Sequence, residues 1–206
     1  MAERTPAWQR ALDVAVGAPL LVASIPLIAV LGAWIRFDST GPALFRQRRI
    51  GLAGRPFDVW KLRTMRVRVG DDLHREHTRR LMGPASDSAP WAPPAEDPRV
   101  TRPGRTLRRL GLDELPQLWN VMRGEMSLVG PRPALPYEVE RWLPEHRRRL
   151  AVRPGLTGFW QVEARRSATF DEMMRMDLAY VERQGLLLDL VILARTPMAL
   201  VRAVRS

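Results

Sequence analysis

The feature that most constrains this fold is an apolar run from Val14 to Ile35 that contains no charged side chain. Its length matches the apolar core of a bilayer, so the run predicts a membrane-embedded helix. It is too long for a cleavable signal peptide, and no small-residue cleavage pattern stands out after it. Because Pro19 and Pro26 each remove a helix hydrogen bond, we expect a bend near Ser24.

Arginine residues flank this run on both sides, with Arg4 and Arg10 before it and Arg36, Arg46 and Arg48 after it. Since positive charge favours the cytoplasmic side of a membrane, this distribution places both ends of the helix on the same face. A kinked, re-entrant helix that enters the bilayer and returns satisfies the pattern. A single transmembrane helix accounts equally well for the apolar run alone.

The composition favours anionic partners. The chain has 33 Lys and Arg residues against 22 Asp and Glu residues, a net charge of +11, and it contains no cysteine. This surplus, nearly all of it arginine, suits phosphate groups, nucleic acid or acidic lipid headgroups. The lack of cysteine excludes disulfides, thiolate nucleophiles and cysteine-bound zinc.

The rest of the chain predicts an α+β fold that is mostly helical and contains one small β-hairpin. Residues 43–49 and 56–62 are rich in Leu, Phe, Val and Trp, and a Gly-containing turn at residues 51–54 separates them. Proline and small residues at 83–98 indicate a surface loop. Helical segments are expected within residues 63–81, from 105 towards the turn at 130–133, over 137–150, and from 170 onwards.

The C-terminal stretch at residues 186–205 is apolar but too charged to span a membrane, since Asp189, Arg195 and Arg202 interrupt it. Its leucines gather on one side and its arginines on another, which is typical of an amphipathic helix lying in the membrane interface. A plain core helix explains this pattern equally well. The helix also offers a surface through which two copies could pair as a homodimer.

Two adjacent carboxylates, Asp113 and Glu114, stand at the head of an apparent helix. The apolar residues that follow recur at helical spacing, and Pro116 is tolerated only within a first helical turn. At such a position the helix dipole favours an ionised carboxylate, available as a nucleophile or a metal ligand. The alternative is that Asp113 is only a helix N-cap.

Arginines lie on both sides of the acidic pair, in a dense cluster before it and at Arg132 after it. Guanidinium groups bind phosphoryl oxygens through paired hydrogen bonds, so this arrangement fits a diphosphate ligand. Mg²⁺ held by one carboxylate and by the phosphate oxygens would reduce the repulsion while the other carboxylate attacks phosphorus. The alternative is a solvated or lipid-facing surface. The cluster consists of Arg99, Arg102, Arg105, Arg108 and Arg109.

Lys61 and Arg63 follow the second predicted strand with a spacing of two residues. Side chains at this spacing can share one face of a strand, so the two are candidates for the same site. The alternative is that both belong to an exposed strand face.

The stretch from Asp97 to Pro133 carries several motifs in a fixed order. They are Asp97-Pro98-Arg99, Arg102-Pro103-Gly104-Arg105, the run from Leu112 to Val121, and the run from Gly124 to Pro133. Shorter motifs occur at residues 45–51, 61–65, 152–158 and 177–181. Together they resemble the bacterial sugar transferases, the small monotopic phosphoglycosyl transferases, from about Arg10 to Leu200.

This resemblance implies an enzyme that transfers a sugar 1-phosphate from a nucleotide diphosphate sugar, usually a UDP-sugar, to polyprenol phosphate. It implies that Asp113 attacks the sugar-proximal phosphorus, releases UMP and forms a covalent aspartyl phosphosugar intermediate. It further implies that Glu114 binds Mg²⁺. Lys61, Arg108, Arg132 and Asp177 fall on family positions at the active site, where we expect them to bind substrate.

The resemblance also implies how the chain is organised. Residues 1–40 would form the membrane-embedded re-entrant helix with its flanks, and residues 41–206 the catalytic domain with its C-terminal interfacial helix. The enzyme would be monotopic in the cytoplasmic membrane of a bacterium, with its catalytic body on the cytoplasmic face. Because long members of the family carry extra helices before this body, the resemblance implies that the chain corresponds to the minimal form.

Two other functional classes fit parts of the sequence. A non-catalytic basic protein would bind nucleic acid or anionic membrane through its arginines, and a scaffold would support an envelope assembly without turnover. The sequence contains no recognisable nucleic-acid-binding motif, and its apolar N-terminus fits a membrane protein better. We therefore expect a UDP-sugar, polyprenol phosphate and membrane lipids as partners, and no nucleic acid.

Overall fold

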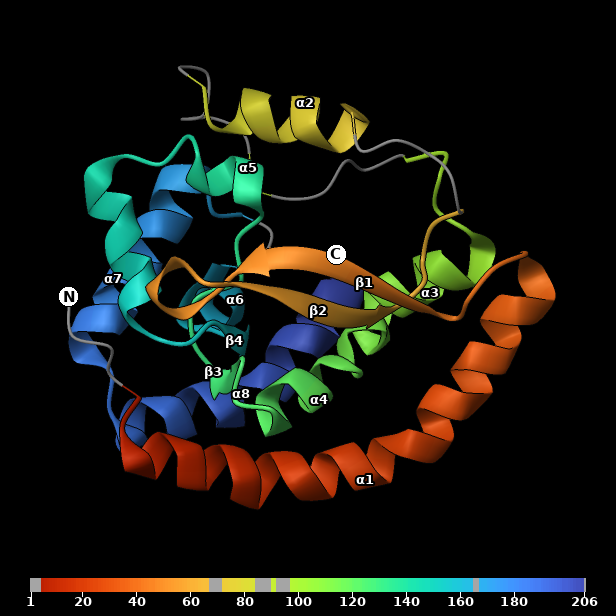
Figure 1. The fold of residues 1–206 in the computed structure, drawn as a ribbon, viewed down its shortest axis with the longest axis horizontal. Helices are drawn as coiled ribbons and strands as arrows, with labels where there is room; N and C mark the ends of the chain where they lie inside the picture. Colours follow the sequence, from red (N-terminus) through yellow and green to blue (C-terminus); the bar gives the residue numbers. More distant parts are fainter. Residues whose placement is uncertain (1–4, 67–71, 84–89, 92–96, 165–166, 206) are drawn as a thin grey trace.

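Helix α1 (Ala7–Asp38) runs along one side of a mostly helical body (Figure 1). The structure is a computed structural model that describes residues 5–66, 72–83, 90–91, 97–164 and 167–205. Pro19 and Pro26 lie inside α1, which is one continuous helix and is curved in Figure 1. Its most apolar window has a mean hydropathy of 2.4 and is only 17% buried. By length and composition, α1 is long and apolar enough to cross a membrane.

Buried polar side chains fasten the N-terminal part of α1 to the body. The Asp13 carboxylate accepts hydrogen bonds from the Ser127 hydroxyl at 2.8 Å and from the Leu128 N–H at 2.7 Å. One helical turn earlier, the Gln9 amide donates to the Val129 carbonyl oxygen at 3.2 Å. Because buried polar groups are stable only when paired, these contacts fix which side of α1 faces inward.

The β-hairpin predicted from residues 43–62 is present. Strands β1 (Leu44–Ile50) and β2 (Pro56–Leu62) pair antiparallel, with the short 3₁₀ turn η1 (Leu52–Gly54) between them. Directly paired residues point their side chains to the same face of such a hairpin, so the pair Phe45 and Lys61 shares a face with the pair Arg49 and Phe57. This face turns inward, since Phe57 and Val59 are buried in the core.

The body consists mainly of short helices (Figure 1). The helix expected from Phe170 begins there, where Thr169 and Glu172 form a capping box. The continuous helix expected over residues 137–150 is wrong, because a four-residue helix and a 3₁₀ segment occupy this region. The elements are α2 (Asp72–Leu81), α3 (Arg102–Leu110), η3 (Leu112–Glu114), α4 (Gln117–Met122), α5 (Pro136–Val139), η4 (Pro144–Ala151), α6 (Phe159–Ala164), α7 (Phe170–Arg183) and α8 (Leu186–Arg205).

A second, parallel strand pair was not expected. Strands β3 (Ser127–Val129) and β4 (Gly155–Thr157) join two segments that are distant in the sequence. Their backbones approach so closely that a Cβ atom on Gly155 would lie 2.1 Å from the Gly130 nitrogen. Only glycine fits such a close approach of two backbones. The approach brings Arg132, just after β3, next to the start of α6.

Helix α8 shows features of both arrangements considered for the C-terminal stretch. Ile192 and Asp189 are buried on its inner side, against the core. Its outer side exposes apolar residues, among them Leu187 at 76% and Met198 at 57%. The helix is therefore part of the core and also presents an apolar surface.

Candidate active site

The acidic pair lies on the 3₁₀ turn η3, between α3 and α4. Helix α3 ends at Gly111, whose left-handed backbone (φ 71°) turns the chain into η3. Helix α4 then begins after Pro116, which takes the N-cap position without any side-chain cap. The pair does lie beside a helix N-terminus, as expected. Asp113 does not cap this helix, so the alternative N-cap role is wrong.

Asp113 is only 8% exposed. Burial raises its pKa, and the neighbouring Glu114 carboxylate raises that pKa further, while Lys61 and Arg108 lower it. The net change in the pKa is an increase, because burial and the Glu114 charge outweigh the two cations. This direction is opposite to the expectation that the helix N-terminus favours the ionised form.

Lys61 reaches the acidic pair from the end of β2. Its ammonium nitrogen lies 3.2 Å from Oε1 of Glu114, and both side chains are partly buried. Arg63, two residues further on, lies elsewhere: it is buried and donates to the backbone oxygens of Thr40 at 2.7 Å and Ser39 at 2.8 Å. Arg63 thus stabilises the C-terminal end of α1. Neither residue belongs to an exposed strand face.

The arginine cluster before the pair divides into inner and outer members. Arg108 donates from Nε to the Thr64 hydroxyl at 2.9 Å, and burial lowers its pKa, whereas the charge of Asp113 raises it. Arg99 is buried in an ion pair with Asp97 at 2.7 Å. The outer members fit the solvated-surface alternative; they are the exposed Arg102, Arg105 and Arg109.

A cavity opens beside Glu114. The inner face of the hairpin, η3, the start of α4, the loop after β3 and helix α6 all contribute to its walls. Arg49 is the most buried of its cations, and burial followed by the charge of Arg132 lowers its pKa to about 10. The polar lining of the cavity comprises the cations Arg49, Lys61 and Arg132, the carboxylate of Glu114, and the amides of Gln117 and Gln161.

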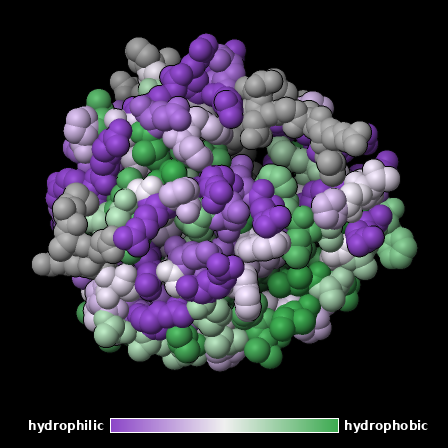
Figure 2. Space-filling model, in the orientation of Figure 1, coloured by the Kyte–Doolittle hydropathy of each residue, from purple (hydrophilic) through white to green (hydrophobic). Residues whose placement is uncertain are grey.

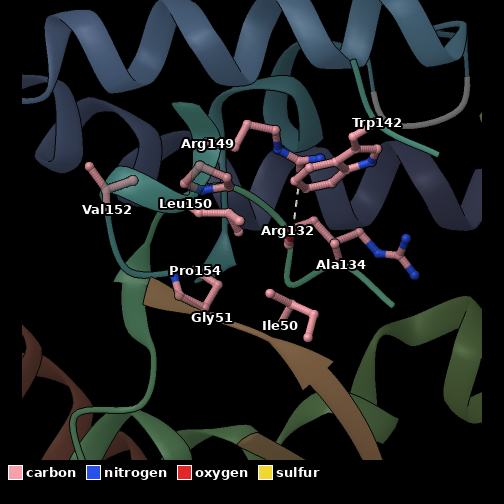
Figure 3. Close-up of a pocket in the computed structure, with 10 residues that line it drawn as sticks. Ile50, Gly51, Arg132, Ala134, Trp142, Arg149, Leu150, Val152 and Pro154 are labelled. Carbon is pink, nitrogen blue, oxygen red and sulfur yellow. Dashed lines mark hydrogen bonds between the residues drawn. The ribbon is translucent and has the colours of Figure 1, made fainter. Parts of the chain in front are cut away.

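Arg132 is held from behind. Arg149 donates to the Arg132 backbone oxygen at 3.0 Å and stacks on the Trp142 ring, 4.9 Å from its centroid (Figure 3). The same guanidinium group lies 2.6 Å from Asp177, which is fully buried. Burial raises the pKa of Asp177 to about 6, although Arg149 and Arg132 lower it. Asp177 was expected to bind substrate. It instead pairs with Arg149, which in turn contacts the backbone of Arg132.

A buried carboxylate next to a cavity with three cations is an arrangement suited to phosphoryl chemistry. The model of the family described as bacterial sugar transferase matches residues 4–203. The chain belongs to this family. Several of the motifs quoted above contribute residues to the cavity of this transferase, among them Lys61, Glu114 and Arg132.

Curated relatives agree with this assignment. The transferase is 38% identical to the exopolysaccharide production protein ExoY of Sinorhizobium fredii, over 91% of this chain and 83% of the relative. It is 42% identical to the UDP-glucose:undecaprenyl-phosphate glucose-1-phosphate transferase of Caulobacter vibrioides, over 91% and 67%. It is 35% identical to the undecaprenyl-phosphate galactose phosphotransferase of Salmonella typhimurium, over 94% of this chain and 40% of that protein.

The donor atoms at the site fit Mg²⁺. Within the described part of the transferase, no group of three or more His, Cys, Asp and Glu side chains could hold a metal ion. Mg²⁺ commonly uses one or two carboxylates and takes its other oxygens from phosphate and water. Glu114, on the cavity wall next to Asp113, offers that set.

Three polar residues that line the cavity of the transferase were not predicted as site residues from the sequence: Arg49, Gln117 and Gln161. Arg49 shares the inward face of the hairpin with Lys61, so strand alternation could have identified it. Gln117 stands four residues after Asp113, a spacing that places two residues on one side of a helical segment. Gln161 carries no such signal, because only the pairing of β3 with β4 brings its helix to the site.

Proposed function

We propose that this transferase moves a sugar 1-phosphate from a UDP-sugar to undecaprenyl phosphate, as the first membrane step of polysaccharide assembly. The observation that carries the proposal is the buried Asp113, adjacent to Glu114 at the cavity that Arg49, Lys61 and Arg132 line. The relatives named for UDP-glucose and for undecaprenyl phosphate support the choice of donor and acceptor.

The cations hold the donor diphosphate. Arg132 can donate paired N–H groups to phosphoryl oxygens. Arg49 adds positive charge, although its Nη1 and Nη2 already donate to the Pro133 carbonyl oxygen and to Gln47 Oε1. Lys61 adds a compact charge beside Glu114. Since these groups are already in place before the ligand binds, they stabilise the charge that develops on the oxygens during transfer. The backbone contact from Arg149 keeps Arg132 at the cavity wall.

Asp113 is the nucleophile in this scheme. One of its carboxylate oxygens attacks the sugar-proximal phosphorus, the bond from that phosphorus to the bridging oxygen breaks, and UMP leaves with the bonding electrons. A phosphate oxygen of undecaprenyl phosphate then attacks the same phosphorus and releases the Asp113 carboxylate. Burial suits this role, because a poorly solvated carboxylate is a stronger nucleophile.

Glu114 is the residue we propose as the Mg²⁺ ligand. When bound, Mg²⁺ neutralises phosphate charge and so lets a carboxylate approach the donor. Lys61 holds Glu114 at the cavity wall through their 3.2 Å ion pair. Arg108, near Asp113, favours the ionised nucleophile.

The membrane location rests on apolar surface. Figure 2 shows hydrophobic side chains gathered along the edge of the molecule that α1 forms. Val22 and Val30 on α1 are 67% and 66% exposed, and Leu187 on α8 is 76% exposed. Such surface is stable against lipid rather than water. We propose that α1 enters the cytoplasmic leaflet and returns to the same side. The catalytic body then stays at the membrane surface on the cytoplasmic side, where its site can reach a lipid-linked acceptor.

The test is UMP release. Purified protein in detergent, incubated with a UDP-sugar, Mg²⁺ and undecaprenyl phosphate, is expected to release UMP, and Asp113→Asn is expected to abolish the release. Arg148→Ala, in an exposed ion pair with Glu182, is a control that should leave the rate unchanged. Unchanged UMP release by Asp113→Asn would overturn the assignment of the nucleophile. Salt-sensitive nucleic-acid binding without turnover would overturn the function itself.

A further inference from the structure

Two amide side chains of the cavity each have one buried atom with no hydrogen-bond partner within the described residues. Gln117 is 3% exposed, and its Nε2 is buried and unpaired. Gln161 lines the same cavity, and its Oε1 is also buried and unpaired. An unsatisfied buried polar atom destabilises the fold, so native proteins keep few of them, and those that line a cavity often pair with a ligand.

Both amides are positioned by the backbone. Gln117 is the first residue of α4, directly after the turn that carries the acidic pair. Gln161 lies in α6, where Gly158 leaves it room: a Cβ atom at Gly158 would stand 3.1 Å from Gln161 Oε1. The two amides therefore reach one cavity from different elements.

The two unpaired atoms, Gln117 Nε2 and Gln161 Oε1, do not together suit a phosphate group as their ligand. Arg49, Lys61 and Arg132 supply cationic donors for phosphoryl oxygens, but an ionised phosphate has no hydrogen to give to Gln161 Oε1. A hydroxyl group accepts from an amide N–H and also donates to an amide oxygen. The pair of amides therefore matches a ligand rich in hydroxyl groups.

The donor sugar is such a ligand and lies in the right place. In the proposed reaction Asp113 attacks the phosphorus that bears the sugar, and Gln117 lines the same cavity as Glu114, the residue next to Asp113. Uracil is separated from that phosphorus by the second phosphate and the ribose. We propose that Gln117 and Gln161 bind hydroxyl groups of the transferred sugar and contribute to its selection. This inference rests on the proposed function.

The experiment pairs each amide with single hydroxyl groups of the donor. UMP release is first measured with UDP-glucose, UDP-galactose and UDP-N-acetylglucosamine, and deoxy analogues of the best donor follow. Gln117→Met and Gln161→Met keep the side-chain length without the amide. Each is expected to lower kcat/KM for the parent donor about tenfold, the contribution of one neutral hydrogen bond. Arg148→Ala is the control, and thermal unfolding in detergent checks the fold.

The decisive result is non-additivity. For the deoxy donor that lacks the bound hydroxyl group, kcat/KM of the wild type is expected to be about tenfold lower than for the parent donor. The matching Gln→Met variant is expected to show little further decrease in kcat/KM when the parent donor is replaced by that deoxy donor. Inhibition by UMP should be the same for wild type and both variants. The inference is overturned if the losses multiply for every deoxy position, or if the variants weaken UMP inhibition as much as they lower kcat/KM. Failure of wild type to release UMP from any donor would overturn the proposed function as well.

Discussion

The ammonium nitrogen of Lys61 lies 3.2 Å from Oε1 of Glu114, so the β-hairpin and the turn bearing the acidic pair are joined across the site. This contact links the first half of the body to the turn η3. It gives the hairpin a function beyond packing, because the same inward face also brings Arg49 to the cavity.

Replacing Lys61 with methionine is expected to lower kcat/KM for the UDP-sugar about 100-fold, because a preorganised charge at the transferring phosphate is lost. Arg48→Ala is the matched control, since Arg48 lies on the outer face of the same hairpin and pairs with Asp58 at 3.3 Å. Its activity should equal wild type. Steady-state UMP release measures both, and equal losses in the two variants would contradict the assigned role of Lys61.

Glu114→Gln keeps the shape of the side chain and removes its charge. We expect the Mg²⁺ concentration for half-maximal rate to rise at least ~10-fold, the smallest loss typical of groups that only orient a metal ligand. The measurement is a Mg²⁺ titration of UMP release at saturating donor. An unchanged Mg²⁺ requirement with a lower maximal rate would assign Glu114 a role other than metal binding.

Much of the fold could be predicted from local patterns. The hairpin was predicted from two runs rich in Leu, Phe, Val and Trp on either side of a glycine-containing turn, and a helix was predicted from about Phe170, where α7 begins. These features depend on neighbours in the sequence. The 3₁₀ segment η4 and the three-residue strands β3 and β4 did not follow, because their stability comes from tertiary packing rather than from local propensity.

The site was predicted only in part, for the same reason. Asp113, Glu114 and Lys61 do come together, and the motifs that contain them are short. Gln161 reaches the cavity only through the β3–β4 pair, a contact between segments far apart in the sequence. Asp177 was predicted to bind substrate, but a sequence pattern cannot distinguish a carboxylate that lines the cavity from one that is buried behind it.

Arg149 and Asp177 should act as positioning residues for Arg132. Removing either charge alone leaves a buried ion unpaired and is expected to destabilise the fold by about 3–5 kcal/mol. The double variant Arg149→Met with Asp177→Leu should regain most stability, because neither charge remains, yet it should keep a raised KM for the donor, since Arg132 has lost its contact. Thermal unfolding and steady-state kinetics report the two effects separately. Wild-type KM in the double variant would show that the pair is only structural.

The topology of α1 can be tested because the chain has no cysteine. Ala7→Cys and Phe37→Cys place single thiols at exposed positions near the two ends of the helix. A re-entrant helix predicts that a membrane-impermeant maleimide labels both variants in vesicles with the cytoplasmic side outward, and neither in vesicles of the opposite orientation. Labelling of one variant in each type of vesicle would show that α1 spans the membrane.

The central claim is covalent catalysis by Asp113, and intact-protein mass spectrometry tests it most directly. The protein is incubated with UDP-sugars and Mg²⁺ in the absence of acceptor. We predict a mass increase equal to one sugar phosphoryl group, assigned to Asp113 by fragmentation, lost on addition of undecaprenyl phosphate and absent in Asp113→Asn. An adduct on another residue, or turnover by Asp113→Asn without any adduct, would contradict the account.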